Sequence, residues 1–335
     1  MTIFRYTNIY KLKTVWNRLY RSLSDVGPLQ SFYPNKIYFD VFRLNFRRAR
    51  LTPLFYYVKE REKEAVIPLI EYRKEKIITE FAPLDYYDIL SSGEELFTKR
   101  ALYEVLSQYP DYLFSFNRIN ERSQAYKCLS SIVSEREKCV RIFLPSFGYE
   151  DYFHSLTKHQ RQNIRTAYNK IEKENIQISL MKFSGGNEIS TQVWRDCMRI
   201  YEQRRLSQGK IPNSIVKRLY YKISNPLEQI MKRTDNNELY VLYLNETPVA
   251  FMAGLLNKVK TEFLVPMLSC SADYLKFSTG IILINEVIKD LIRENVKSID
   301  LGRGDEQYKY FMGGSEHINH SFKEPVSIIL DLLKC

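Results

Sequence analysis

The segment 270–280, CSADYLKFSTG, has the side chains best suited to bind an anion. It joins a predicted strand to a predicted helix, over 261–269 and 281–293. Ser278 or Thr279 can cap this helix, and Gly280 allows a ligand close to the backbone. The first N–H groups and the positive end of the helix dipole would then point into the loop, where Lys276 adds a full charge. This predicts a phosphate or pyrophosphate site; the alternative is a capped helix that binds nothing.

A second group of reactive side chains follows a predicted strand in residues 299–314, IDLGRGDEQYKYFMGG. Charged and aromatic residues at a strand end are typical of sites in α/β proteins. Asp300 or Asp305 can accept a proton, Tyr308 can donate one, and Arg303 or Lys309 can hold an anion. The alternative is a polar turn with an Arg303–Asp305 salt bridge, which contributes little. No GxGxxG sequence opens a helix here, so we exclude a dinucleotide-binding fold.

The third feature is a basic helix predicted within residues 150–175. Lys158, Arg161, Arg165 and Lys173 surround a narrow apolar face. The functional interpretation is contact with an anionic substrate or with nucleic acid, and the alternative is a solvated helix face. No aromatic-bearing strand of the kind found in RNA-binding modules accompanies the helix.

Other enzyme classes leave no motif in this chain. There is no serine nucleophile elbow, HExxH, P-loop or CxxC. The five cysteines are odd in number and widely spaced, and the four histidines are scattered, so we expect neither a disulfide framework nor a metal site.

Composition indicates a globular protein of two domains. The chain has 335 residues, of which 44% are hydrophobic and 27% charged. The net charge of +11 favours an anionic partner: nucleic acid, an acidic membrane surface or a phosphorylated cofactor. No apolar run approaches ~18 residues, so we expect no membrane-spanning helix. The N-terminus lacks the features of a secretory signal, and we therefore expect a cytoplasmic protein.

Hydrophobic spacing predicts alternating strands and helices. The first half is predicted to have helices at 9–23 and 94–108 and strands at 54–59, 65–72, 77–81, 112–116 and 140–144. The second half is predicted to have helices at 187–208, 215–232 and 281–293 and strands at 176–183, 238–244, 249–256, 261–269, 296–301, 317–322 and 326–330. Single strands and a meander together predict a mixed sheet. We place the domain junction just before the basic helix, giving domains 1–149 and 150–335.

Seven segments together resemble the GNAT acyltransferase superfamily. They are PLQSFY at 28–33, AVIPLIEY at 65–72, APLDYYDIL at 82–90, LTKHQRQNIRTAYNKIEKE at 156–174, LNETPVAFMAGL at 244–255, YLKFSTGIILINEVI at 274–288 and IDLGRGDEQYKYFMGG at 299–314. The closest branch is named after cellulose-biosynthesis acetyltransferases (CelD/BcsL type). Its relatives include the FemABX-like aminoacyl transferases.

The resemblance implies an α+β fold of two tandem GNAT-like domains, each a mixed, largely antiparallel sheet flanked by helices. Domain 1–149 would be degenerate, and domain 150–335 would hold acyl-CoA between its fourth and fifth strands, with 150–175 as a linking helix. The pyrophosphate would rest on Lys276, Ser278, Thr279 and Gly280. This loop departs from the usual Q/R-x-x-G-x-G/A, since Leu275 stands at the basic position and Lys276 one place beyond it.

The implied activity is acyl-CoA-dependent N-acyl transfer, usually of acetyl, to an amine of a small or sugar-nucleotide acceptor in polysaccharide or cell-envelope synthesis. No metal is implied. Backbone N–H groups of Val265, Met267 and Leu268 would stabilise the oxyanion. We nominate Tyr308 to protonate the thiolate, Asp305 as base with Asp300 or Glu262 behind it, and Arg161 and Arg165 to grip an acceptor phosphate, beside Arg303 and Lys309.

Two alternatives stay open. One is a FemABX-like aminoacyl transferase that uses aminoacyl-tRNA, the only nucleic acid we expect as a partner; it should retain tRNA with a steep salt dependence. The other is a non-catalytic GNAT-fold module that binds a nucleotide or glycan.

Overall fold

The computed structural model describes residues 1–335 except 25, 83, 134, 186–188, 211–213, 215–225 and 335. The chain forms two compact units. The first comprises Met1–Lys138 and Ile318–Cys335, and the second comprises Cys139–His317. Each unit has its own hydrophobic core, and its strands form one part of a 13-stranded sheet.

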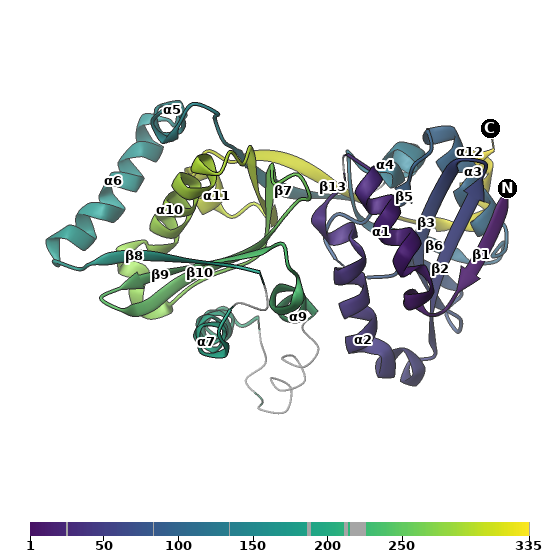
Figure 1. Cartoon of the computed structure of the whole chain (residues 1–335), viewed down its shortest axis with the longest axis horizontal. Coiled ribbons are helices and arrows are strands. Elements are labelled where there is room, and N and C mark those ends of the chain that lie inside the picture. Colours follow the sequence, from purple (N-terminus) through teal and green to yellow (C-terminus); the bar gives the residue numbers. More distant parts are fainter. Residues whose placement is uncertain are drawn as a thin grey trace. The chain divides into compact units, whose positions relative to one another are not determined.

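The sheet of the first unit follows the order β1-β2-β3-β4-β6-β13, with the short β5 beside β3 (Figure 1). Its strands are β1 (Thr2–Tyr6), β2 (Leu51–Glu60), β3 (Lys63–Tyr72), β4 (Ile77–Glu80), β5 (Leu90–Ser91), β6 (Leu113–Asn120) and β13 (Ser315–Pro325). Its helices are η1 (Ile9–Leu12), α1 (Lys13–Ser22), η2 (Pro28–Gln30), α2 (Phe32–Arg48), α3 (Glu95–Leu106), α4 (Gln124–Leu129), η3 (Ser130–Ile132) and α12 (Val326–Leu333). Only the β4–β6 pair is parallel among the pairs described in this sheet.

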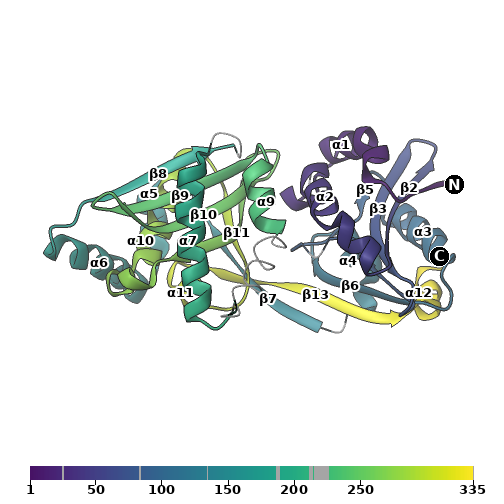
Figure 2. The same ribbon diagram turned by 90° about the horizontal axis from the view of Figure 1, so that it is seen from below.

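The sheet of the second unit follows the order β7-β12-β11-β10-β9-β8. Its strands are β7 (Glu135–Phe143), β8 (Ile178–Ser184), β9 (Asn237–Leu244), β10 (Thr247–Leu256), β11 (Glu262–Cys270) and β12 (Ser298–Arg303). Its helices are α5 (Tyr149–Ser155), α6 (Lys158–Lys173), α7 (Thr191–Ser207), α9 (Pro226–Arg233), η4 (Ala272–Phe277), α10 (Thr279–Arg293) and α11 (Gln307–Phe311). Helices α5, α6 and α10 cover one face and α7 and α9 the other; Figure 2 shows α7 crossing the strands. Again one described pair, β11–β12, is parallel.

Two strands lie where the chain passes from one unit to the other. β7 comes after η3 and pairs with β12, whereas β13 comes after α11 and pairs with β6. The units therefore differ from the division predicted at residue 149: residues 139–149 belong to the second unit, and residues 318–335 to the first. The roles assigned to the two domains stay predictions.

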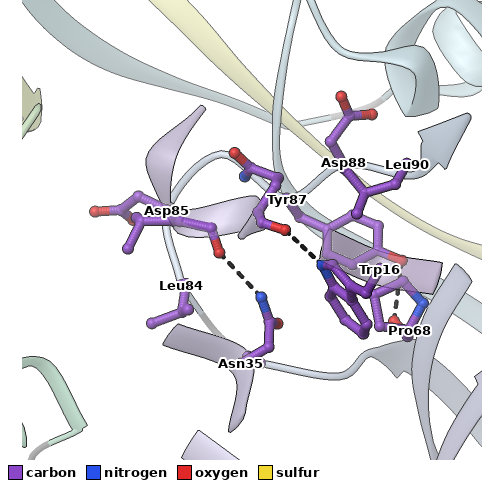
Figure 3. A pocket seen from close by; sticks show the side chains of 11 residues that line it. Trp16, Asn35, Pro68, Leu84, Asp85, Tyr87, Asp88 and Leu90 are labelled. Atoms are coloured by element: carbon purple, nitrogen blue, oxygen red, sulfur yellow. Dashed lines mark hydrogen bonds between the residues drawn. The ribbon is translucent and has the colours of Figure 1, made fainter. Parts of the chain in front are cut away.

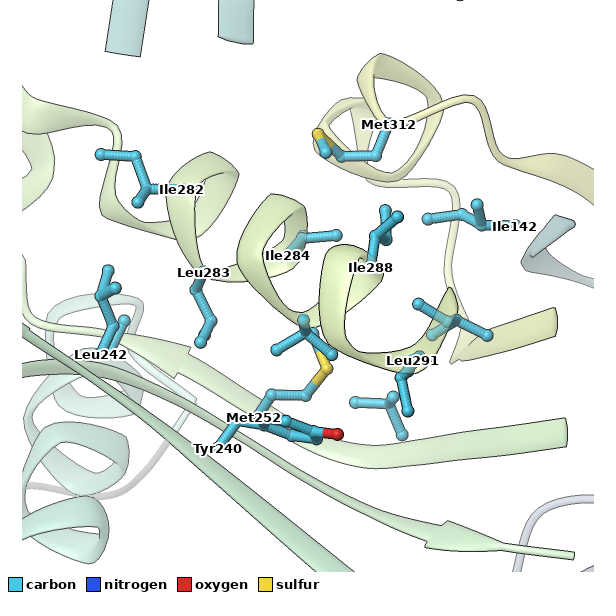
Figure 4. Close-up of a cluster of buried hydrophobic side chains, with 14 of the residues drawn as sticks. Ile142, Tyr240, Leu242, Met252, Ile282, Leu283, Ile284, Ile288, Leu291 and Met312 are labelled. Carbon is cyan, nitrogen blue, oxygen red and sulfur yellow. The ribbon is translucent and has the colours of Figure 1, made fainter. Parts of the chain in front are cut away.

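Helix α10 carries most of the core on its side of the second sheet (Figure 4). Its fully buried side chains recur three or four residues apart, as in Leu283, Val287 and Leu291. Each such side chain contributes roughly 1.5–3 kcal/mol by leaving water. They pack on alternate residues of β9 and β10, including Tyr240 and Met252. The helix and the strands beside it are thereby fixed in place.

One predicted element is wrong, and one long helix was missed. The strand predicted at 326–330 is helix α12, whose Val326, Ile329 and Leu333 pack against α3 at helical spacing. Helix α2 was not predicted, because aromatic residues surround most of it and obscure the amphipathic pattern. The predicted helix at 215–232 lies partly outside the described residues, which show α9 at its end. Among the described helices, none combines the length and apolar character needed to cross a bilayer.

A buried carboxyl group lies inside the first unit. Asp88 Oδ1 accepts hydrogen bonds from the backbone N–H of Ile89 at 2.7 Å and of Ala125 at 3.0 Å. Beside it is a cavity of about 20 Å³, with Trp16 and Tyr87 in its wall, which is room for one water molecule (Figure 3). Burial raises the pKa of Asp88 to about 7, against the pull of these backbone donors.

We predict that the first unit loses stability as the pH rises from about 4 to 7. In this range folded Asp88 keeps a proton that the unfolded chain has released, so unfolding becomes easier by on the order of 4 kcal/mol. Asp88→Asn should remove this slope, because the amide oxygen can still accept both N–H groups. The free energy of unfolding at each pH is measured by urea titration in a Trp194→Phe background, which leaves Trp16 as the only fluorescent tryptophan.

The exposed Asp331 provides a matched control, because its carboxylate pairs only with Lys334 in the same helical turn among the interactions described. Asp331→Asn should keep the wild-type slope. An unchanged slope in Asp88→Asn would contradict the prediction.

Candidate active site

Strands β11 and β12 separate in the middle of the second sheet. They are paired only where Glu262–Leu264 face Ser298–Asp300. Beyond Leu264, β11 continues to Cys270 beside β10, and no described pairing joins it to β12. The edge of β11 that faces away from β10 therefore has no described strand partner over residues 265–270.

Two features shape β11 at this point. Its pairing with β10 shifts register so that Val265 and Pro266 together oppose Gly254, which is a β-bulge. A Cβ atom on Gly254 would lie 2.5 Å from the Leu264 carbonyl oxygen, so the close approach requires glycine. Pro266 has no N–H to donate, and a bulge is one of the few places where a sheet accepts proline.

The direction of the β11 amides follows from one hydrogen bond. Ser271 N–H donates to Val249 O at 2.7 Å. Ser271 and Val249 are therefore a hydrogen-bonded pair, next to the pair of Cys270 and Ala250. Successive residues of an antiparallel pair alternate between inward and outward N–H groups. Leu268 and Cys270 therefore direct their N–H groups away from β10. Of the residues nominated for the oxyanion, Leu268 has this orientation, whereas Met267 faces β10 and Val265 lies in the bulge.

The N-terminus of α10 lies just after β11. Ser278 adopts φ +55° at the N-cap position, but its side chain makes no capping bond, and neither does that of Thr279, so the expected side-chain cap is wrong. Ile281 and Ile282 N–H donate to the Ser278 carbonyl. In the described part of the chain, the amides of Thr279 and Gly280 have no acceptor. The first turn contains no acidic residue, and Lys276 is exposed beside it.

Cys270 lies between these two features. A Cβ atom on Gly280 would be 3.0 Å from its Sγ, so glycine keeps this contact open. Burial raises the pKa of the Cys270 thiol to about 11, while the Thr279 hydroxyl and the charge of Arg204 act in the opposite direction. Arg204 is in the last turn of α7, which packs on β11 and η4. Sequence analysis missed Arg204, because basic residues commonly end helices.

Tyr308, on α11, lies close enough to Cys270 for the two groups to interact electrostatically. Burial raises the pKa of its phenol, and the nearby Glu306 and Cys270 raise it further. The phenol is thus protonated at neutral pH. Among the described residues its hydroxyl has no hydrogen-bond partner, and its ring packs against the core below α10.

Lys309 is buried, and its ammonium group donates hydrogen bonds to backbone carbonyl groups. Its Nζ donates to the carbonyl oxygens of Arg303 at 2.6 Å, Gly304 at 3.0 Å and Gly302 at 3.3 Å, and pairs with Glu306 at 3.0 Å. Burial alone would raise the pKa of Glu306, but Lys309 holds it below its usual value. The predicted anion-holding role of Lys309 conflicts with this arrangement, because its donors are directed at the loop that positions Tyr308.

Asp300 is fully buried, with both carboxylate oxygens engaged. Oδ2 accepts from Arg141 Nη2 at 2.8 Å and lies 3.2 Å from His317 Nε2, and Oδ1 accepts from Gly302 N–H at 2.8 Å. Glu262 Oε2 lies 3.4 Å from the same Arg141 nitrogen. Ile299 and Leu301 belong to the α10 side of the sheet, so Asp300 faces the α7 side. Arg141 was missed, although an arginine inside an apolar strand signals a buried partner.

The remaining predicted residues lie elsewhere. Asp305 is exposed and its charge acts on Tyr310, and Arg303 is partly buried at the end of β12. Arg161 Nη1 donates to the carbonyl oxygens of His154 and Leu156, and the Arg165 guanidinium lies 5.4 Å from the Phe153 ring centre. Both arginines therefore fix α6 to α5.

A larger hollow, of about 490 Å³, lies at the other end of the second sheet. Its lining includes Glu238 at the start of β9 and Leu256 at the end of β10. Because Leu256 pairs with Phe263, roughly 20 Å along β11 separates this hollow from Cys270. We therefore do not assign it to the site.

Comparison with known proteins identifies the fold. Residues 158–310 match the family model described as an acetyltransferase (GNAT) domain. The chain has a tandem GNAT fold. FemX superposes with a TM-score of 0.61 at 10% identity, covering 100% of both chains. A tandem GNAT protein from the clavulanic acid biosynthesis pathway gives 0.50 at 7% identity, over 97% of this chain and 99% of that one.

The C-terminal domain of a putative lysylphosphatidylglycerol synthetase from Agrobacterium fabrum gives a TM-score of 0.56 at 8% identity, over 97% of this chain and 95% of that one. No match was found among the curated proteins. These likenesses show the fold; the CelD/BcsL branch stays a prediction.

The tandem GNAT fold allows the two units to be compared at equivalent places. In the first unit, β4 and β6 are the parallel pair. Beyond their ladder, Tyr87 bridges to Ile119 of β6 and its N–H donates to the Arg118 carbonyl at 3.0 Å, which closes the gap with the unit's own chain. The following helix, α3, begins with Glu94 and Glu95, which repel an anion at its N-terminus. In the described residues, the β11 edge without a strand partner and the helix that begins without an acidic residue both lie in the second unit.

We predict that Lys309→Met lowers the free energy of unfolding by about 2–4 kcal/mol, because it leaves buried carbonyl groups without a donor. Denaturant titration of the full chain measures this. The exposed Lys170 on α6 is the control, since Lys170→Met should leave stability unchanged. Equal stability of the two variants would show that the Lys309 bonds contribute nothing.

Proposed function

We propose that the second unit is an acyl-CoA-dependent N-acyltransferase. The observation that carries this proposal is that the open edge of β11, the free amides of α10 and the protonated Tyr308 lie together in one unit, while the equivalent place in the other unit is closed. The acyl group is most simply acetyl. The acceptor is an amine on a small molecule or sugar nucleotide, and its pathway and the cytoplasmic location stay predictions.

The donor fits the groups that the chain presents. The N–H groups of Thr279 and Gly280 would donate hydrogen bonds to the pyrophosphate, with Lys276 adding charge from η4. Gly280 leaves space where any other residue would press on Cys270. Arg204, whose charge acts on Cys270, is a further cation that would bind a phosphate or a charged acceptor.

Leu268 and Tyr308 would perform the transfer. The acceptor nitrogen forms a bond to the thioester carbonyl carbon, and Leu268 N–H stabilises the charge on the carbonyl oxygen. When the carbon–sulfur bond breaks, Tyr308 gives its proton to the sulfur and regains one from solvent. The nitrogen loses its proton to a base, for which Asp305, exposed beside this loop, stays the candidate.

Two alternatives to this proposal have different signatures. The exposed cations of α6, including Lys158, Lys170 and Lys173, favour an aminoacyl-tRNA donor, as the FemABX-like resemblance implies. Such a protein would bind tRNA with a steep salt dependence and release no CoA thiol. A non-catalytic module would bind a nucleotide or glycan without any turnover.

We predict that acetyl-CoA binds at one site and that Lys276→Glu weakens it about tenfold, because the reversed charge faces the pyrophosphate. Calorimetry at low and high salt measures this, and the loss should shrink as salt screens the charge. Lys170→Glu makes the same charge change on an exposed helix and should bind normally. If wild-type protein binds no acyl-CoA, this form of the proposal fails.

We predict that Tyr308→Phe lowers kcat about 100-fold and leaves the acetyl-CoA Kd unchanged, because only proton delivery to sulfur is lost. Release of free thiol in the presence of a panel of amines and amino-sugar nucleotides follows the reaction. Tyr310→Phe, which removes an exposed hydroxyl bonded to Glu316, is the control. Full activity of Tyr308→Phe would remove its proton-donor role.

A further inference from the structure

We propose that Arg141 is a positioning residue of the donor cleft: it holds the Asp300 carboxylate in the orientation that separates β12 from β11. This inference rests on the proposed function for its link to acyl-CoA. Its structural part concerns only the strands of the second unit.

The Arg141–Asp300 pair is a cross-strand contact inside the sheet. The two residues are direct partners in the β7–β12 register, and Arg141 Nη2 is 2.8 Å from Asp300 Oδ2. Asp300 is 0% exposed and Arg141 6%. An ionised carboxylate is stable at such a position only with a charged partner and hydrogen bonds. Arg141 therefore maintains both the charge and the orientation of Asp300.

The second oxygen of Asp300 bends β12. Oδ1 accepts the Gly302 N–H at 2.8 Å, two residues along the same strand. Gly302 has φ +66°, a left-handed conformation that glycine adopts without strain, and the β7–β12 register shifts between Asp300 and Arg303. The parallel ladder with β11 ends at Asp300. The turn held by this carboxylate is thus located where the cleft opens.

Two further groups face the pair. His317 Nε2 is 3.2 Å from Asp300 Oδ2, and Glu262 Oε2 is 3.4 Å from Arg141 Nη2. Arg141 therefore forms an ion pair with both carboxylates. Removing it takes away the positive charge beside them and the contact that holds the Asp300 carboxylate at the turn.

Arg141 lies on β7, the strand that follows α4 of the first unit. The cleft of the second unit is therefore completed by a residue from before the boundary predicted at residue 149. The N-terminal half of the chain contributes to the donor site through one side chain and one strand.

The test compares Arg141→Met and Asp300→Asn with Arg141→Lys in the full chain. We expect the first two to raise the acetyl-CoA Kd by about 10- to 100-fold, because the turn that leads from β12 to Tyr308 shifts relative to the amides of β11 and α10. Arg141→Lys keeps the charge and should recover most of the affinity. The double variant Arg141→Met/Asp300→Asn should be no worse than the poorer single variant, because both changes break the same contact.

The matched control is Lys182→Met, which breaks another partly buried charge network of the second unit, with Glu238, Asp290 and Glu294. It should lower the melting temperature without changing the acetyl-CoA Kd. If the Arg141 variants only lower the melting temperature and bind acetyl-CoA like Lys182→Met, the positioning role is overturned.

Hydrogen exchange supplies a readout that needs no ligand. Peptides covering 265–270 and 300–304 should exchange faster in Arg141→Met and Asp300→Asn than in wild type or Lys182→Met, because the turn at Gly302 loosens. Unchanged exchange overturns the inference even if acetyl-CoA binds. Failure of wild-type protein to bind acetyl-CoA, with faster exchange in the variants, would instead refute the proposed donor alone.

Discussion

The second unit depends on one hydrogen-bonded carboxylate. The two oxygens of Asp300 make different hydrogen bonds. Oδ2 accepts from Arg141, and Oδ1 accepts from the Gly302 N–H, which would otherwise be free to pair with a neighbouring strand. The parallel ladder stops after three residue pairs, where β11 has its bulge at Val265 and Pro266 and β12 has the Asp300–Gly302 turn. Here the side chain competes for the backbone donor, and the left-handed glycine directs the strand away. The described β11–β12 pairing ends beside this turn, whereas the outward direction of the Leu268 amide comes from the register between β10 and β11.

The comparison of the two units shows how one fold gives an open or a closed site. Both contain a meander followed by a helix and a parallel strand. In the first unit, Tyr87 bridges to β6 and the following helix begins with two glutamates. In the second unit the helix begins with Ser-Thr-Gly after a basic residue, and its first amides have no described acceptor. Differences of a few residues at equivalent places thus separate a structural copy from a candidate catalytic one.

Several residues that the sequence predicts as anion ligands make contacts within the fold. Lys309 has the charge expected of an anion ligand, but three carbonyl groups and Glu306 surround its ammonium group. Arg161 and Arg165 are directed at α5. In each case the residue type suits anion binding, but the charged group contacts a nearby backbone carbonyl or an aromatic ring. Tyr308 differs, since its hydroxyl has no described partner and it faces Cys270.

Sequence by itself determined the elements around the site. The stripe of Leu283, Val287 and Leu291 predicted α10, and the alternation of 249–256 and 261–269 predicted its neighbouring strands, because these periods are local properties of the chain. The sequence also led us to predict an anion site at residues 270–280, which stays a prediction. Only the tertiary structure decided that the β11–β12 pairing ends after Asp300, that Arg141 contacts Asp300, and that β13 pairs with β6. Arg141 and Asp300 are 159 positions apart, and the β13–β6 partners are 199 or more apart, so no local pattern encodes these contacts.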